Sequence, residues 1–277
     1  MIKTAVITDA GIANRYMPYT KTIPKGMIPM GNKPVMHLVV EECLTAGIDK
    51  AIIITDEKGK RLYTDYFLKK LVSSKNSRLK ESSIQELENI QMVSERIEFE
   101  ILIQPEDLPY GNGTPLLSVQ DKLKSEPGFL YLYSDNVIFG GETTTEALVD
   151  MYKDDDTADA YIAVKKVTEE QIVNHASIVI DNENEYTIAR LVEKPKAGKA
   201  PSLLASYGRY LLTNKIFDYL NKESLGKNNE LWTSYAISKM AQNGKVKYVV
   251  PENICMTTGD PDNYLKTCIE YHKRNEF

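Results

Sequence analysis

Short, continuously apolar runs alternate along the chain with segments whose apolar positions recur at helical spacing. The runs TAVIT (4–8) and AIIIT (51–55) are typical of strands that are covered on both faces of a sheet. The segment 32–47 between them has helical periodicity and ends at Gly47, a residue type that commonly caps helix C-termini. The order strand, helix, strand predicts a right-handed crossover unit of a parallel sheet.

The remaining chain continues this alternation. Strands are expected at 98–104, 129–136, 158–167 and 206–213, in a hairpin over 177–195 that turns at 182–185, and as a pair within 246–260. Helices are expected at 59–72, 115–123, 214–223, 231–244 and 261–277. Residues 71–97 are polar and carry charges on most faces, which indicates a solvated helical insertion. We therefore expect one α/β domain over residues 1–277, with a mixed central sheet flanked by helices and an insertion at about 71–97.

Composition narrows the possible partners. The net charge of −5 provides no basic field, so duplex nucleic acid is not an expected partner. No apolar run reaches the roughly 20 residues that a membrane span needs, and the N-terminus lacks the features of a signal peptide, so no membrane association is expected. The cysteines are widely spaced without a CxxC pair, which indicates neither a zinc site nor a disulfide framework. We expect a cytoplasmic protein with reduced thiols.

Ligands of open α/β sheets bind beyond the carboxyl ends of the strands, so residues that follow strands are candidates for chemistry. The segment after the first strand, AGIANRYMPYTKTIPKG (10–26), joins a glycine-containing turn to Arg15 and Lys25. Backbone N–H groups in such a turn can bind an anion, and the two cations suit phosphate oxygens. The segment is neither a Walker A loop nor a dinucleotide fingerprint. On these residues alone, solvated surface cations are an equal alternative.

Two other strand ends carry candidate groups. Asp135 follows an apolar strand and could ligate Mg²⁺, which prefers one or two carboxylates together with phosphates and water. It could equally cap a turn. Glu193 and Lys194 lie at a strand end before Pro195 and could clamp hydroxyls and a phosphate. The alternative, which these two residues alone favour, is an exposed ion pair that contributes almost nothing to stability.

Together these motifs resemble those of the sugar-1-phosphate nucleotidyltransferases, most closely the bacterial-type UTP–glucose-1-phosphate uridylyltransferases. The resemblance runs through nearly the whole chain, in AGIANRYMPYTKTIPKGMIPMGNKP, VVEECLTAGI, GKRLYTDYF, PYGNGTPLL, VEKP, APSLLASYGRYLLT and GDPDNYLK. It implies a Rossmann-like nucleotidyltransferase fold. It also implies transfer of a nucleotidyl group from a nucleoside triphosphate, here UTP, to a sugar 1-phosphate, here glucose 1-phosphate, with release of pyrophosphate. Homo-oligomers, dimers or tetramers, are usual in this family.

The resemblance implies roles for the nucleotide and its phosphates. The base would meet backbone groups of Ala10 and Gly11 and be read by Gln104 and Gly111. The catalytic cations would be Arg15 and Lys25 on the triphosphate and Lys194 on the sugar phosphate, and Asp135 would ligate Mg²⁺. The attacking phosphate oxygen is largely ionised near neutral pH, so no general base is needed.

The resemblance also implies a sugar site. Glu193 would bind sugar hydroxyls, and Gly208 of the GRY motif would lie near the sugar. Ser177 stands where the family has glycine and is a further sugar-site candidate. His175 lies near this loop, and a structural or solvent-exposed role is expected for it.

Several positions depart from the family pattern. Ala13 and Asn14 replace the Gly-Thr pair of the first loop, and Ala13 lacks the freedom of glycine at positive φ. Asp9 replaces a small residue and would repel phosphate unless a metal ion or a lysine offsets its charge. Thr257 stands where the family has a second metal-binding aspartate, and Asp260 could compensate.

Three interpretations follow from the family residues that this chain retains and those that it lacks. The first is an active transferase with altered sugar or nucleotide preference, and the second is a glucose-1-phosphate uridylyltransferase with a tolerant metal site. The third is a catalytically impaired relative that binds nucleotide or nucleotide sugar as a regulatory or assembly subunit. The retained cations and acids favour an enzyme, whereas Thr257 and the altered loop favour the binder.

Overall fold

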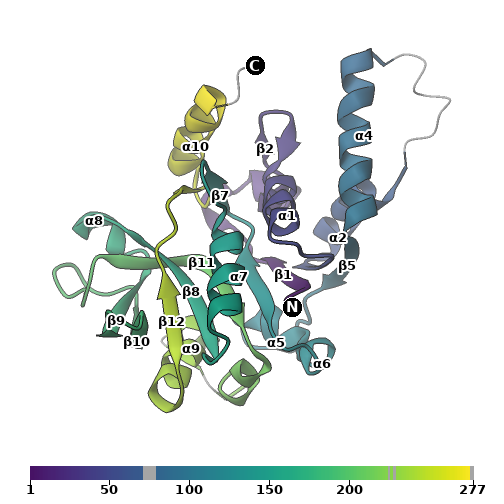
Figure 1. Ribbon diagram of the computed structural model, residues 1–277. Helices are drawn as coiled ribbons and strands as arrows, with labels where there is room; N and C mark the ends of the chain where they lie inside the picture. The colour runs from purple at the N-terminus through teal and green to yellow at the C-terminus, as the bar shows by residue number, and fades with distance from the viewer. Residues whose placement is uncertain (71–78, 224, 227–228, 275–277) are drawn as a thin grey trace.

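A mixed sheet of nine strands forms the centre of the computed structural model, which describes residues 1–70, 79–223, 225–226 and 229–274 (Figure 1). The strand order among these residues is β5-β4-β1-β6-β11-β8-β12-β10-β9. The strands are β1 (Thr4–Asp9), β4 (Lys50–Thr55), β5 (Glu98–Ile103), β6 (Phe129–Tyr133), β8 (Ala160–Lys166), β9 (Ala176–Asn182), β10 (Thr187–Glu193), β11 (Leu204–Leu212) and β12 (Val246–Val249). The predicted mixed α/β architecture is confirmed.

One half of the sheet is parallel. Strand β1 pairs with β4 on one side and β6 on the other, and β4 pairs with β5, all in parallel. Ala5, Val6 and Ile7 are completely buried, as the continuous apolar run predicts for a strand covered on both faces. The other half is mixed: β11 runs antiparallel to β6 and β8, β12 runs parallel to β8, and β9 and β10 form the predicted hairpin.

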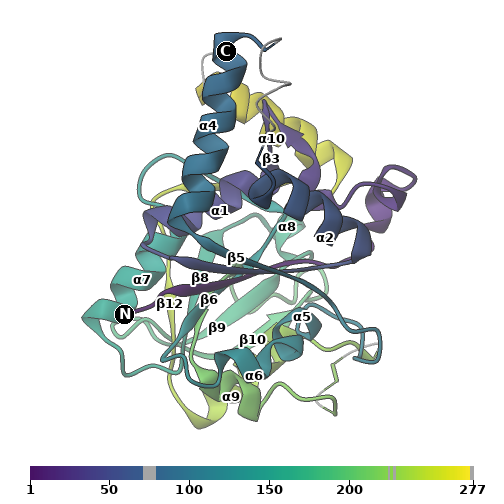
Figure 2. The ribbon, with the colours of Figure 1, turned by 90° about the vertical axis from the view of Figure 1, so that its right-hand side faces the viewer.

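Helices cover both faces of the sheet (Figure 2). Side chains from α1 (Val35–Thr45), α2 (Glu57–Tyr63), α4 (Glu81–Arg96) and α7 (Thr144–Asp154) pack on one face. Side chains from α5 (Thr114–Ser118), α6 (Gln120–Leu123) and α9 (Thr233–Asn243) pack on the other. The chain also forms α8 (Glu169–Ile172) and α10 (Pro261–Arg274). No helix among the described residues combines the length and apolarity needed to cross a bilayer.

The predicted late strand pair is wrong, because its two strands do not pair with each other. Strand β12 joins the central sheet, whereas β13 (Ile254–Thr257) pairs with β7 (Asn136–Phe139) in a separate antiparallel sheet. Pro251 lies between β12 and β13 and lacks the amide hydrogen that would continue a ladder. A third small sheet joins β2 (Pro29–Met30) to β3 (Lys33–Pro34).

Helix boundaries differ from the expectation in three places. The helix expected at 59–72 begins at Glu57, because Asp56 caps it by accepting from the Gly59 amide at 2.8 Å, and it passes into the π-helical turn η4 (Thr64–Leu68). The helix expected at 214–223 is reduced to the 3₁₀ turn η5 (Asn214–Asp218). Helix α7 was not predicted, although the capping box of Thr143 and Glu146 marks its start.

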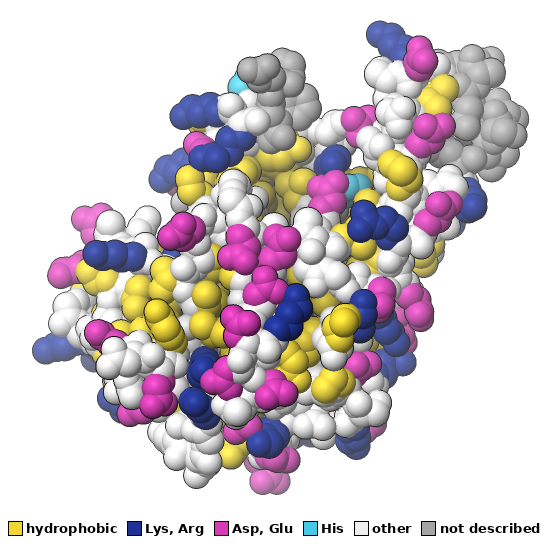
Figure 3. Space-filling view, in the orientation of Figure 1, with side chains coloured by type: hydrophobic (Ala, Val, Ile, Leu, Met, Phe, Trp, Pro, Cys, Tyr) yellow, Lys and Arg dark blue, Asp and Glu magenta, His cyan; other side chains and the backbone are white. Residues whose placement is uncertain are grey.

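Helix α4 occupies much of the expected insertion and extends away from the sheet (Figure 1). Val93 is its buried residue, which fits the polar composition of this segment. Residues 71–78 of the expected insertion lie outside the described residues. The division of the chain into one domain with an insertion stays a prediction. On the face shown in Figure 3, acidic and basic side chains are interspersed.

Candidate active site

A pocket of about 910 Å³ lies where β6 and β8 end, β9 begins and β10 ends. Five of the residues predicted from the sequence line this pocket: Arg15, Asp135, Glu193, Lys194 and Gly208. The predicted Ala10, Gly11, Lys25, Gln104, Gly111 and Ser177 are not among its lining residues. The pocket therefore brings together groups from positions as distant in sequence as the first loop and the end of β10.

Asp135, which lines the pocket, forms an ion pair with Lys25, which does not. Lys25 belongs to the 3₁₀ turn η3 (Lys25–Met27), and its ammonium donates to Oδ2 of Asp135 at 2.7 Å. The two side chains are only 18% and 22% exposed. Burial alone would raise the pKa of Asp135, but the Lys25 ammonium outweighs it and holds this pKa below its usual value. Asp135 is therefore ionised at neutral pH and available as an oxygen ligand.

The first loop reaches across to the C-terminal segment. Ala13 adopts the left-handed conformation, with φ of 51°, which costs an L-residue about 1–2 kcal/mol. Its carbonyl accepts from Thr20 at 3.0 Å. Arg15 is largely exposed, with Nη1 3.8 Å from Oδ2 of Asp260, and the Tyr16 hydroxyl donates to the Thr258 carbonyl at 2.6 Å. The loop thus keeps the backbone shape that glycine would favour and presents Arg15 at the pocket.

Asp9 does not lie open to a bound phosphate, contrary to the concern raised by its charge. Its side chain is 4% exposed and accepts from the Ser134 hydroxyl at 2.8 Å, the Gly26 amide at 3.1 Å and the Tyr63 hydroxyl. Burial raises the pKa of Asp9, and the Lys25 charge opposes this shift. The carboxylate is therefore an internal acceptor beside the ion pair.

Of the residues assigned to the base, Ala10 and Gly11 follow β1, Gln104 follows β5, and Gly111 lies in the loop before α5. Ala10 is half-buried and Gly11 is exposed. The backbone N–H of Gln104 donates to the Thr55 carbonyl at 2.8 Å. Gly111 has φ of 148°, and the backbone of Leu231 fills the space that a Cβ would take, so this position requires glycine. These four residues lie outside the pocket lining, and their base contacts stay a prediction.

The sugar-site candidates are held by hydroxyl and backbone contacts. Glu193 accepts from the Ser234 hydroxyl at 2.6 Å, and Lys194 has φ of 42° with its amide donating to the His175 carbonyl at 3.1 Å. Gly208 has φ of 76° and lies against the Tyr133 ring, which would collide with any Cβ. Ser177 is buried, and its hydroxyl donates to the Ser202 carbonyl at 2.8 Å, so this hydroxyl is not offered to the pocket.

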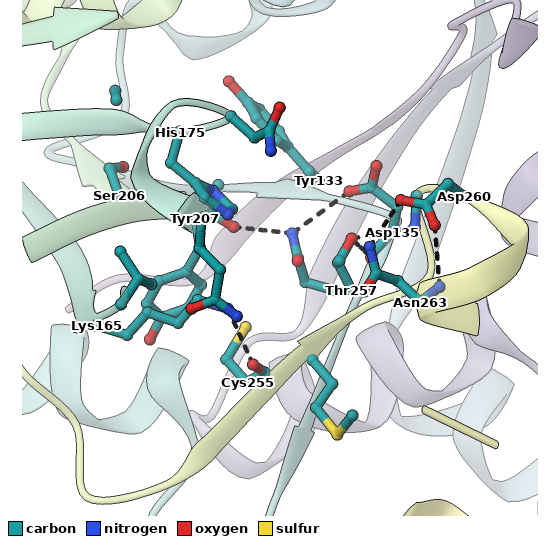
Figure 4. A pocket seen from close by; sticks show the side chains of 18 of the residues that line it. Tyr133, Asp135, Lys165, His175, Ser206, Tyr207, Cys255, Thr257, Asp260 and Asn263 are labelled. Carbon is teal, nitrogen blue, oxygen red and sulfur yellow. Dashed lines mark hydrogen bonds between the residues drawn. The ribbon is translucent and has the colours of Figure 1, made fainter. Parts of the chain in front are cut away.

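Lys165 was not assigned from the sequence, and His175, for which a structural or solvent-exposed role was expected, also lines the pocket (Figure 4). Lys165, near the end of β8, donates to the Cys255 carbonyl at 3.0 Å and lies over the Tyr207 ring. Burial lowers the pKa of His175 to about 4, so the imidazole is neutral at pH 7. The rule that ligands lie beyond strand ends could have found Lys165, because it follows an apolar run.

A buried ion pair supports the turn that carries Asp135. Arg209 is completely buried, and its guanidinium donates to both carboxylate oxygens of Glu42, at 2.9 Å in the closest contact. It also donates to the carbonyls of Tyr133 and Asn136, at 2.8 and 2.9 Å, on either side of Asp135. Arg209 therefore fixes the turn between β6 and β7 from the protein interior.

The donor set near Asp135 fits an ion that shares its coordination with substrate phosphates. The described residues contain no group of three or more His, Cys, Asp or Glu that could hold a metal ion. The Thr257 hydroxyl donates to the Asp135 carbonyl at 3.0 Å and accepts from the Gly259 amide at 3.1 Å. Asp260 caps α10 by accepting from the backbone N–H of Asn263 at 2.9 Å. One carboxylate, Asp135, is left, which suits Mg²⁺ because this ion keeps waters and phosphate oxygens as its other ligands.

Comparison with known proteins relates the whole chain to one family. The family described as nucleotidyl transferase matches residues 4–274. The UTP–glucose-1-phosphate uridylyltransferase of Staphylococcus epidermidis is 34% identical over 98% of this chain and 92% of the relative. A crystal structure of UDP-glucose pyrophosphorylase complexed with UDP-glucose is 27% identical and covers 99% of this chain and 100% of its own, with a TM-score of 0.86. A UTP-bound UGPase of Acinetobacter baumannii covers 100% of this chain and 95% of its own at 26% identity, with a TM-score of 0.85.

Proposed function

Because the chain belongs to the nucleotidyl transferase family, we propose that it transfers the uridylyl group of UTP to glucose 1-phosphate, giving UDP-glucose and pyrophosphate. The proposal rests on the observation that one pocket is lined by four of the predicted residues: Arg15, Asp135, Glu193 and Lys194. Lys25 is paired with Asp135. The names of the relatives support the choice of uridine and glucose.

In this reaction a phosphate oxygen of glucose 1-phosphate attacks the α-phosphorus of UTP. One P–O bond forms, the bond to the β-phosphate bridging oxygen breaks, and pyrophosphate leaves with the electron pair. The attacking oxygen is largely ionised near pH 7, so no side chain has to remove a proton. The protein's task is in-line positioning and neutralisation of charge. Arg15 and Lys25 would neutralise the triphosphate, Lys194 the sugar phosphate, and Glu193 would accept hydrogen bonds from sugar hydroxyls.

Mg²⁺ is the cofactor that fits the site. Asp135 would hold the ion, which, when bound, supplies positive charge to the phosphate oxygens. We expect Asp135→Asn to raise the Mg²⁺ concentration needed for half-maximal activity, and Thr257→Asp to lower it, because a second carboxylate would strengthen the site. Titration of each variant with Mg²⁺ at saturating substrates tests this. If neither variant changes the requirement, Asp135 is not the ligand.

The direct test of the activity is pyrophosphate release with Mg²⁺, over a grid of five nucleoside triphosphates against four sugar 1-phosphates. The triphosphates are UTP, dTTP, CTP, ATP and GTP, and the sugars are glucose, galactose, N-acetylglucosamine and mannose. We expect the highest kcat/KM for UTP with glucose 1-phosphate. A different best pair would replace the substrates in the proposal but keep the reaction.

A catalytically impaired relative is the second candidate, and the absence of a carboxylate at Thr257 favours it. Such a protein would bind nucleotide or nucleotide sugar as a regulatory or assembly subunit. A blank grid together with UDP-glucose binding by calorimetry would identify this function. A single productive pair would exclude it.

We also infer that the protein acts in the cytoplasm as a homo-oligomer, a dimer or a tetramer. Two apolar side chains one turn apart on α10, Leu265 and Ile269, are 62% and 48% exposed and support a contact between copies. Light scattering of the purified chain measures the assembly. A monomer at micromolar concentration would contradict this part of the proposal.

A further inference from the structure

Three segments, one of which leads into the pocket residue Asp135, meet at a buried carboxylate that the proposed mechanism does not use. Asp9 ends β1, and its Oδ1 accepts from the Ser134 hydroxyl at 2.8 Å. Its Oδ2 accepts from the Gly26 amide at 3.1 Å and from the Tyr63 hydroxyl of α2. Because Gly26 follows Lys25 and Ser134 precedes Asp135, the carboxylate holds the immediate neighbours of both members of the ion pair.

This arrangement explains why residue 26 is a glycine. A Cβ at Gly26 would lie 2.9 Å from Oδ2 of Asp9 and still closer to the Tyr63 hydroxyl, distances that real side chains do not tolerate. The position is buried and has no positive φ that would itself call for glycine. The residue at position 26 and the acid at position 9 are therefore sterically complementary: the backbone of the Lys25 turn approaches the carboxylate with no side chain between them.

A carboxylate suits this position better than an amide. Three donors converge on Asp9, one backbone N–H and two hydroxyls, and a carboxylate accepts from all of them. An asparagine of the same shape would present its NH₂ group to at least one of these donors, so that at least one of the present hydrogen bonds is lost or reversed in direction. The Lys25 ammonium also lies close enough to be stabilised by the Asp9 charge.

From this geometry we propose that Asp9 is a positioning residue for nucleotidyl transfer, which holds Lys25 and Asp135 together at the spacing that receives the triphosphate. The inference rests on the proposed function for its kinetic readout. It assigns to Asp9 no contact with substrate. Its effect on the reaction passes through the turn η3 and through Ser134.

The test compares the wild-type chain with Asp9→Asn in the full-length protein. We expect the KM for UTP to rise and kcat to fall, each by about 10-fold, because a lost hydrogen bond to a buried charged group is worth about that factor or more. The KM for glucose 1-phosphate should change less than about two-fold, since Glu193 and Lys194 are held by other contacts. A lower melting temperature with unchanged kcat and KM for UTP, or equal changes in both KM values, would overturn the proposal.

A matched pair of tyrosines on neighbouring turns separates positioning from general stability. Tyr63→Phe removes a donor to Asp9, whereas Tyr66→Phe removes a hydroxyl that contacts Nδ1 of His37 at 3.1 Å. We expect Tyr63→Phe to raise the KM for UTP several-fold and Tyr66→Phe to leave it unchanged. Equal effects of the two variants would contradict the proposal.

The last measurement separates failure of this inference from failure of the proposed function. UTP affinity is measured by calorimetry without sugar phosphate, so it does not require turnover. If the wild-type chain binds UTP but does not turn over, weaker binding by Asp9→Asn still supports the positioning role, while the proposed activity is refuted. If binding is equal in both proteins, Asp9 does not position the phosphate-binding groups.

Discussion

The two ends of the pocket are held by different kinds of interaction. At the phosphate end, so named for its proposed ligand, Arg15 and Asp135 line the pocket, and Asp135 is fixed by its ion pair with Lys25 at 2.7 Å, beside the buried Asp9. At the sugar end, formed by Lys165, His175, Glu193, Lys194 and Gly208, the contacts are hydroxyls, carbonyls and a neutral imidazole. Under the proposed function, the triphosphate would meet fixed charges, whereas sugar preference would depend on groups that can change without disturbing those charges.

The largest effect is expected at the phosphate end. Lys25→Ala should lower kcat/KM by about 1000-fold or more, because it removes a preorganised cation and leaves Asp135 without its partner. Lys21→Ala is the matched control, since Lys21 lies in the same loop with an exposed side chain and should change activity less than about two-fold. Pyrophosphate release measures both, and far-UV circular dichroism checks the fold. Near-normal turnover by Lys25→Ala would refute the difference between the two ends.

The next effect concerns the stability of the turn between the ends. Glu42→Gln should lower the free energy of unfolding by about 3–5 kcal/mol, because it leaves the completely buried Arg209 with an uncompensated charge. Glu41→Gln is the control, since Glu41 is 38% exposed and pairs with Lys33 and His37. Its effect should stay near or below about 1 kcal/mol. Urea unfolding measures both changes, and similar losses would show that burial of Arg209 does not matter.

At the sugar end the effect should be smaller and selective. Glu193→Gln should raise the KM for glucose 1-phosphate by about 10-fold and leave the KM for UTP within about two-fold, because it weakens hydrogen bonds to hydroxyls. Glu185→Gln, at an exposed position of the hairpin, serves as the control. Initial rates over both substrates give the two KM values. A larger rise for UTP than for the sugar phosphate would place Glu193 at the wrong end of the pocket.

The last effect is a dependence of stability on pH. Burial lowers the pKa of His175 to about 4, below the value of about 6.5 for an unfolded chain. Between these values the unfolded state binds more protons, so the stabilisation is complete above pH 6.5 and is lost as the pH falls toward 4. The wild type should therefore lose unfolding free energy relative to His175→Asn as the pH falls over this range. Urea titrations at pH 7, 6 and 5 test this, and parallel pH profiles would contradict it.

The sequence predicted the elements well where one pattern determines one element. The buried parallel strands follow from runs such as those of β1 and β4, and the strand-end rule indicated Arg15, Lys25, Asp135, Glu193 and Lys194. The family resemblance was confirmed over residues 4–274. The roles assigned to single residues stay predictions.

Long-range partners could not be predicted from the pattern. Glu42 meets Arg209 across 167 positions, and nothing near either residue indicates the other. Likewise, β13 pairs with β7 rather than with the strand before it, because pairing depends on where the preceding chain leaves an open edge. The charge of Asp9 indicates repulsion of phosphate unless a metal ion or a lysine offsets it. Its internal role could not be predicted, because its three donors come from segments that are separate in sequence.

The link between the first loop and the last helix has a consequence for synthesis of the protein. The amide of Thr258 donates to the Asp135 carbonyl at 2.7 Å, the Tyr16 hydroxyl donates to the Thr258 carbonyl, and the Tyr264 hydroxyl donates to the Pro29 carbonyl at 2.5 Å. A chain still on the ribosome therefore lacks the contacts that hold its first loop until residues 258–264 have emerged. Contacts over such separations form late in folding. A nascent chain, or one clipped before residue 258, would carry Arg15, Lys165 and Lys194 and still lack the lining residues between 259 and 267.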